Sequence, residues 1–140
     1  MGSVWWEEET AVRERVLRRT SRRWRDKFAE AWRGIKRGIR GHSSFFVHFF
    51  FAVSAVAMAA VLQCTLWEWC LIIGCIGLVL TAELFNSAIE TLFHGLDIAS
   101  KARIQGCLDI AAGAVLLASM TAAVIGTLIF GQRIIELWWR

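Results

Sequence analysis

Two glutamates and an asparagine interrupt the second of three long apolar stretches in this sequence. Glu83, Asn86 and Glu90 are spaced i, i+3 and i+7, and at about 3.6 residues per turn this spacing places them on one face of a helix. Asp109 opens the third apolar stretch. An ionisable side chain inside a membrane span costs about 2.5–3.5 kcal/mol on insertion scales, so such residues indicate a functional site by default.

Two kinds of chemistry fit these side chains. The apolar stretches contain no lysine or arginine that could pair with the acids. Oxygen ligands near a membrane surface suit Mg²⁺, which proteins usually hold with one or two carboxylates and the phosphates of a substrate. The alternative is polar packing, in which Asn86 and one carboxylate hydrogen-bond between helices. The residues alone leave three readings open: a metal or proton site, structural polar packing, and a small ion or proton pathway.

The elements that position these residues are predicted to be membrane-spanning helices. Spans of about 20 apolar residues cross a bilayer, and the sequence offers three, at about 44–66, 70–93 and 109–131. Only helices and closed barrels satisfy backbone polar groups in lipid, and these stretches lack the alternation of strands. We therefore predict an all-α membrane protein, with an N-terminal amphipathic surface helix followed by three transmembrane helices in one domain over 42–140.

The N-terminal part is predicted to be basic and to lie on the membrane surface. Twelve of the 16 lysines and arginines fall between Arg13 and Arg40. We expect a flexible tail over 1–12 and a basic amphipathic helix over 13–41, with Trp32 on its apolar side. Such a helix binds anionic lipid headgroups. A basic segment is also compatible with nucleic acid, but its place directly before membrane spans favours lipid, and we expect no nucleic-acid partner.

Charge distribution also predicts the topology. Short basic segments stay on the cytoplasmic side, which places the N-terminus inside, Trp67–Trp69 outside, the polar 94–108 loop inside and the C-terminus outside, in a multi-pass protein of the inner membrane. Lys101 and Arg103 in the inner loop agree with this orientation. The acids Glu7–Glu9 and a long basic segment precede any apolar run, so a secretory signal peptide is not expected.

Composition and cysteine spacing exclude several classes of protein. Hydrophobic residues make up 56% of the 140 residues and charged residues 20%, which excludes a disordered protein and a two-domain soluble enzyme. The cysteines form no CxxC pair and no zinc-type spacing. We expect them to be small buried hydrophobic residues without disulfides; they are Cys64, Cys70, Cys75 and Cys107.

Three segments carry a resemblance to a known family. Residues 82–90 read AELFNSAIE, which closely resembles the signature of the small prokaryotic diacylglycerol kinase family, including undecaprenol kinases: Glu, two apolar residues, Asn, Ser or Thr, Ala, an aliphatic residue, Glu. Residues 108–117 resemble the family's second block, in which a Lys-Asp pair opens an Ala-rich third span. Residues 28–35 resemble the end of its surface helix. The resemblance covers roughly 26–130 in the same order.

The resemblance implies an integral membrane lipid kinase. Such enzymes transfer the γ-phosphoryl group of ATP to the hydroxyl of diacylglycerol or a polyprenol, with Mg²⁺. They are homotrimers with active sites between neighbouring subunits at the cytoplasmic face. By position, Glu83 matches the general base for the lipid hydroxyl and Glu90 matches a metal-binding carboxylate. Asn86 and Asp109 match polar residues that bind substrate or nucleotide in the same site.

Three positions depart from the family pattern. Leu108 stands where the family has a lysine that contacts ATP phosphate, and His94 and His42 stand where it has acids. His42 is the candidate second metal ligand, although Mg²⁺ prefers oxygen. Lys101, Arg103 or the basic helix would then supply the missing phosphate charge. The alternative is a catalytically impaired, pseudokinase-like binding or structural protein of the same fold.

His48 in the first span also matches the family, because a histidine is common there in the Gram-positive branch. The residue alone favours a structural role, as a polar side chain hydrogen-bonded within the helix bundle.

Overall fold

The computed structural model describes residues 24–41 and 44–139, and all of its regular structure there is α-helical. The helices are α2 (Trp24–Gly41), α3 (Ser44–Val61), α4 (Leu66–His94) and α5 (Ile98–Trp138). The last three are long and apolar enough to cross a membrane. The predicted all-α fold, with an N-terminal helix before three membrane helices, is confirmed. The tail over 1–12, the helix start over 13–23, and His42 lie outside the described residues.

The chain divides into two units, Met1–Arg37 and Gly38–Arg140, and α2 lies largely in the first. Its apolar side chains recur at intervals of three or four residues and are exposed, as a helix with one apolar face requires; they are Trp24, Phe28, Trp32, Ile35 and Ile39. Lysines lie over two of these rings, with Nζ of Lys27 5.2 Å from Trp24 and Nζ of Lys36 5.7 Å from Trp32. This pattern fits a helix at a lipid surface.

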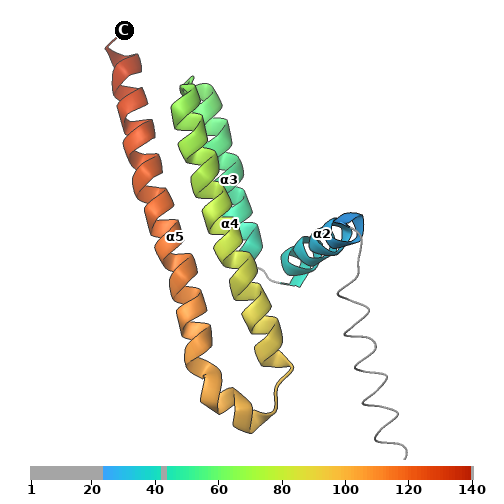
Figure 1. Ribbon diagram of the computed structural model, residues 1–140. Helices are drawn as coiled ribbons and strands as arrows, with labels where there is room; N and C mark the ends of the chain where they lie inside the picture. The colour runs from blue at the N-terminus through green and yellow to red at the C-terminus, as the bar shows by residue number, and fades with distance from the viewer. Residues whose placement is uncertain (1–23, 42–43, 140) are drawn as a thin grey trace, which may run out of the picture. The chain divides into compact units, whose positions relative to one another are not determined.

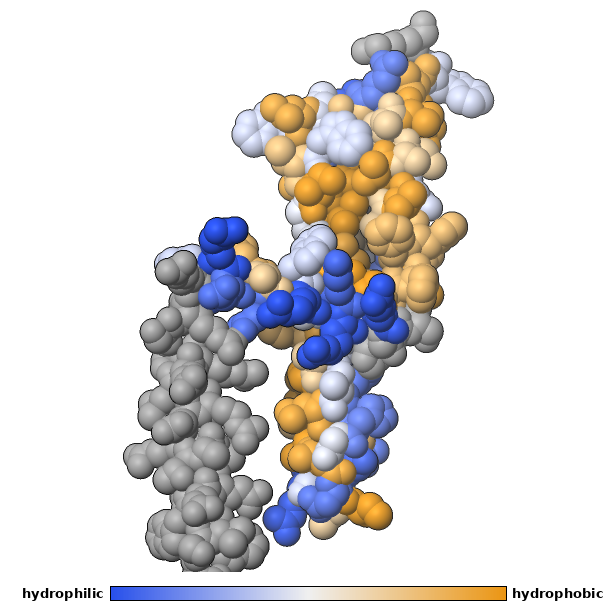
Figure 2. Space-filling model, turned by 90° about the vertical axis from the view of Figure 1, so that its right-hand side faces the viewer, coloured by the Kyte–Doolittle hydropathy of each residue, from blue (hydrophilic) through white to orange (hydrophobic). Residues whose placement is uncertain are grey.

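The second unit is built on a hairpin of α3 and α4, with the longer α5 running antiparallel to α4 (Figure 1). α4 packs most extensively against α5, and α3 packs mainly on α4. A small core joins all three helices at Ala59, Ile72 and Ile129. Hydrophobic residues cover much of the outer surface of the upper part of the molecule in Figure 2, as expected where lipid is the solvent.

The connections between these helices are short. The sequence predicts a loop over 94–108, but in the structure α4 ends at His94 and α5 begins at Ile98. Asp97 causes this early start because it is an N-cap, whose carboxylate accepts hydrogen bonds from the backbone N–H and the hydroxyl of Ser100 at 3.0 and 2.7 Å. These bonds hold the pKa of the Asp97 carboxyl below its ordinary value.

The polar residues Glu83, Asn86 and Glu90 lie in the C-terminal half of the long helix α4. At about 1.5 Å per residue, the 29 residues of α4 extend for about 43 Å, more than the roughly 30 Å of a hydrocarbon core. If the span starts at Cys70, about 20 residues of hydrocarbon end near Glu90. Glu83 then lies inside the apolar layer, and Glu90 lies at its boundary.

At the opposite end of the unit, a cluster of charged residues joins α4 to α5. The backbone N–H and hydroxyl of Thr65 donate to Oε2 of Glu68 at 2.6 and 2.7 Å, which is a capping arrangement for α4. Arg133 of α5 donates two hydrogen bonds to the same carboxylate, from Nη2 to Oε2 at 2.6 Å and from Nε to Oε1 at 3.0 Å. Its Nη1 donates to Glu136 at 2.9 Å. Two membrane helices are thereby tied together by a bidentate pair.

Candidate active site

The polar face of α4 is buried at its C-terminal half. Glu83 is 2% exposed, Asn86 8% and Ser87 1%, although all three side chains are polar. Among the described residues, buried side-chain atoms without a hydrogen-bond partner include Oε1 of Glu83, Oδ1 of Asn86 and Oγ of Ser87. An unsatisfied buried polar group costs about 1–3 kcal/mol. The three residues lie on adjacent turns of one helix, which makes this face a candidate site for a polar ligand.

Asn86 and Glu90 form the outer pair of this face. Nδ2 of Asn86 donates to Oε1 of Glu90 at 3.0 Å, which is the i to i+4 contact that their spacing allows. The bond orients the Glu90 carboxylate and also fixes the Asn86 amide, whose Oδ1 is the buried acceptor left without a partner. A carboxylate and an amide oxygen therefore lie together near the end of α4.

Glu83 has a neighbour from another helix. Nε2 of His48, on α3, lies 3.8 Å from Oε2 of Glu83, and the two side chains are 19% and 3% exposed. The sequence favours a structural role for His48 and does not connect it with Glu83. The available signal was its position: His48 lies about one turn into α3, and it is a polar residue in an otherwise apolar stretch.

The remaining site candidates lie on or near α5. Lys101 is half-buried, with Nζ 5.8 Å from the ring of Phe93, one turn beyond Glu90 on α4. Asp109 and Arg103 are exposed. The structure thus brings Glu83 to His48, Asn86 to Glu90, and Lys101 to the end of α4, and it leaves Asp109 and Arg103 open to the surroundings of this chain.

The three positions that depart from the family pattern differ in their surroundings. Leu108 is half-buried on α5, and His94 is exposed at the end of α4 with its ring 6.2 Å from that of Phe93. His42, the candidate second metal ligand, lies outside the described residues. In the part of the chain that the structure describes, no three His, Cys, Asp or Glu side chains gather into a group that could hold a metal ion.

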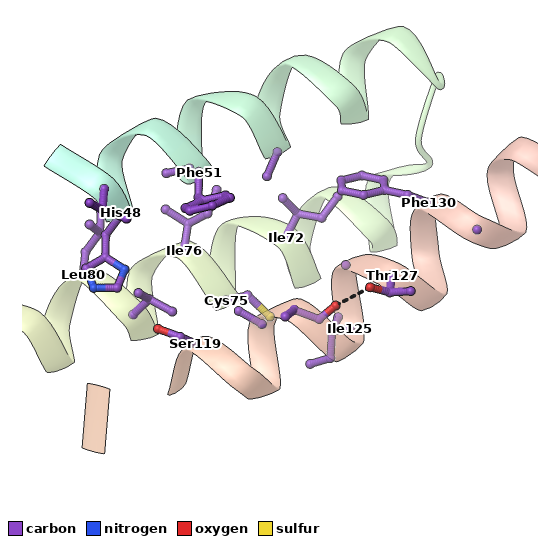
Figure 3. Close-up of a pocket in the computed structure, with 18 of the residues that line it drawn as sticks. His48, Phe51, Ile72, Cys75, Ile76, Leu80, Ser119, Ile125, Thr127 and Phe130 are labelled. Atoms are coloured by element: carbon purple, nitrogen blue, oxygen red, sulfur yellow. Dashed lines mark hydrogen bonds between the residues drawn. The ribbon is translucent and has the colours of Figure 1, made fainter. Parts of the chain in front are cut away.

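An apolar pocket of about 730 Å³ lies among α3, α4 and α5 (Figure 3). His48 and Ser119 are polar members of its wall, which otherwise consists mainly of side chains such as Phe51, Ile76 and Phe130. Oγ of Ser119 is buried without a partner. His48 therefore has two neighbours of different character: the pocket on one side and the Glu83 carboxylate on the other.

Comparison with known proteins identifies the family. Residues 29–130 match the family described as prokaryotic diacylglycerol kinase, and this range contains every described candidate residue. The chain is also 31% identical over 106 residues to the undecaprenol kinase of Bacillus subtilis (strain 168), covering 74% of this chain and 84% of that protein. No solved structure matches it. The buried Glu–Asn–Glu face of α4 lies inside the matched range, and the chain belongs to the prokaryotic diacylglycerol kinase family of membrane lipid kinases.

Proposed function

We propose that this protein phosphorylates the hydroxyl of diacylglycerol or a polyprenol at the cytoplasmic membrane face, with ATP and Mg²⁺. The observation that carries the proposal is Glu83, which is 2% exposed and whose Oε1 has no hydrogen-bond partner among residues 24–41 and 44–139. The lipid hydroxyl oxygen attacks the γ-phosphorus, its proton passes to Oε1 of Glu83, and the bond to the bridging oxygen breaks to release ADP. A base and precise positioning are what phosphoryl transfer needs from a protein.

Glu90, which is seven residues after Glu83 on α4, offers the kind of oxygen ligand that a magnesium ion prefers. Mg²⁺ is commonly held by one or two carboxylates together with substrate phosphates, and it keeps several waters. Glu90 would be its carboxylate ligand, and the hydrogen bond from Asn86 would keep that carboxylate in place. His42 stays a proposed second ligand. When bound, the ion would neutralise charge that develops on the transferred phosphoryl group.

The nucleotide would be bound by residues of α4 and α5. Asn86 offers a buried amide oxygen, and Asp109 is exposed at a family position in α5. Positive charge for the phosphates would come from Lys101, whose place over Phe93 brings it toward the end of α4 that carries Glu90, and from Arg103. Lys101 and Arg103 together would take the role of the family lysine whose position is occupied here by Leu108.

The orientation follows from the charge distribution. The basic α2 would lie on anionic headgroups of the inner leaflet, with its exposed Trp24, Phe28 and Trp32 in the lipid interface. The N-terminus and the short α4–α5 connection would be cytoplasmic, and the C-terminus would be periplasmic or extracellular. This orientation brings the site to the side where ATP is available.

We further propose that the protein is a homotrimer. Asp109 and Arg103 are exposed in a single chain, whereas Glu83 and Asn86 are buried and Glu90 and Lys101 are half-buried. A neighbouring subunit would enclose the site and exclude water from it. Molecular mass in detergent, measured by light scattering after subtracting the detergent, tests this directly.

Leu108 supports one alternative, a pseudokinase that keeps the fold without turnover. The leucine side chain at that position, which is half-buried, has no charge and no hydrogen-bond donor for a phosphate. Purified protein is mixed with radiolabelled ATP, Mg²⁺, diacylglycerol and undecaprenol, and the lipid products are separated. A labelled lipid supports the kinase and identifies its substrate. Nucleotide binding without a labelled product from either lipid supports the pseudokinase.

A further inference from the structure

We propose that His48 is a positioning residue for Glu83, which it holds in the orientation needed to accept the proton of the lipid hydroxyl. This inference rests on the proposed kinase activity. It starts from the two oxygens of the Glu83 carboxylate, whose surroundings differ. Oε2 lies 3.8 Å from Nε2 of His48, whereas Oε1 is buried and has no hydrogen-bond partner in the described part of the chain. One oxygen thus faces the imidazole Nε2, which in the proposal carries the N–H group, and the other is left for the substrate.

A base on a flexible side chain needs such a restraint. The Glu83 carboxylate can rotate about its terminal bond, which has no strong rotamer preference. A donor at Oε2 would fix the carboxylate plane and would leave Oε1 as the acceptor. The distance of 3.8 Å exceeds that of a hydrogen bond, but catalytic hydrogen bonds are often long before substrate binds and tighten in the complex. Burial strengthens the contact, because few water dipoles compete with it.

Packing does not account for His48. The core that joins α3 to α4 and α5 is apolar and lies elsewhere, at Ala59, Ile72 and Ile129. The polar bonds that tie α4 to α5 are also elsewhere, at Glu68 and Arg133. His48 lines the apolar pocket of Figure 3, where an aliphatic side chain would pack at least as well. A polar side chain at this position is explained by its neighbour Glu83.

Two amide variants separate positioning from packing. In His48→Gln the side-chain NH₂ reaches about as far as the imidazole Nε2, whereas in His48→Asn it stops one carbon short; both side chains are neutral and can donate. We expect His48→Asn to lower kcat about 10- to 100-fold, with KM for lipid and ATP nearly unchanged, and His48→Gln to stay within about threefold of the parent. Phe51→Leu, in the same pocket wall and one turn away, controls for altered packing and should keep the parent kcat.

The assay uses full-length protein in mixed micelles with the lipid that the parent phosphorylates, and Tm is measured for every variant. Equal kcat for the Gln and Asn variants overturns the role of His48, as does a loss of kcat in both that follows a loss of Tm. A parent without activity on either lipid overturns the proposed kinase and the role of His48 with it. An active parent whose Asn variant keeps full kcat overturns the role of His48 alone.

Discussion

The side-chain amide of Asn86 donates a hydrogen bond of 3.0 Å to Oε1 of Glu90, one turn further along α4. The bond links two residues of the family signature and leaves Oδ1 of Asn86 as a buried acceptor without a partner. If Glu90 holds Mg²⁺, Asn86 helps to orient this metal ligand. Partners of this kind typically change metal affinity or activity 10- to 100-fold when they are removed.

Asn86→Leu should therefore raise the Mg²⁺ concentration needed for half-maximal activity about tenfold or more. The measurement is kinase activity against MgCl₂ at a fixed concentration of ATP. Thr91→Val is a suitable control, because the hydroxyl of Thr91 bonds only its own helix, at the carbonyl of Ser87. An unchanged Mg²⁺ dependence in Asn86→Leu would show that Asn86 does not orient a metal ligand.

Leu108→Lys should improve ATP binding. The substitution restores the charge that the family pattern has beside Asp109, and a hydrogen bond to a charged group contributes about 1.5–3 kcal/mol. Lys101 and Arg103 are already nearby in sequence, so we expect a smaller effect than this. The KM for ATP should fall by about three- to tenfold. Leu108→Met controls for side-chain shape. A KM that stays the same or rises in Leu108→Lys would place the phosphates away from this position.

Arg133→Met should lower stability without impairing catalysis. It removes the bidentate hydrogen bonds that join Glu68 to α5. The Glu68 carboxylate, which is only 17% exposed, then lacks its cation. Glu68 precedes Glu83 by about 22 Å along α4, at about 1.5 Å per residue. We expect Tm to fall by several degrees while kcat at low temperature stays near that of the parent. Gln132→Met, which removes only an exposed bond to Glu136, should leave Tm unchanged.

The Asp97 cap should contribute pH-dependent stability. Hydrogen bonds from Ser100 lower the pKa of this carboxyl in the folded protein. A lowered native pKa gives stability that is present above the unfolded value of about 3.9 and is lost as the pH falls through the native value. Asp97→Ala should therefore lower Tm at neutral pH, and the difference from the parent should shrink as the pH is reduced below about 4. A difference that is the same across this range would contradict the role of the charged form.

The main elements of the fold could be predicted because each has a local cause. A helix that crosses a bilayer needs about 20 apolar residues, and the predominantly apolar stretches at 44–66, 70–93 and 109–131 have that length. The sequence did not predict the early start of α5. The polar composition of 94–108 indicated a loop, although Asp97 followed by Ser100 is an N-cap signal for a helix. The spacing from Thr65 to Glu68 is a capping signature that could have predicted where α4 begins.

The site was only partly predictable. Spacing along one helix places Glu83, Asn86 and Glu90 on one face, because helical geometry alone determines it. Contacts between helices depend on register and rotation, which a single sequence does not determine. The approach of His48 to Glu83 and of Arg133 to Glu68 therefore emerged only from the structure.

The central claim is that Glu83 accepts the proton of a lipid hydroxyl, and Glu83→Gln tests it most directly. The substitution keeps size and polarity but removes the base, which contributes about 10²- to 10⁴-fold in rate. The measurement is kcat for phosphoryl transfer from ATP to the lipid that the parent uses, with membrane insertion and Tm checked in parallel. We expect insertion and Tm near the parent values and kcat reduced at least 100-fold. A correctly inserted Glu83→Gln protein that phosphorylates lipid at the parent rate would contradict the account.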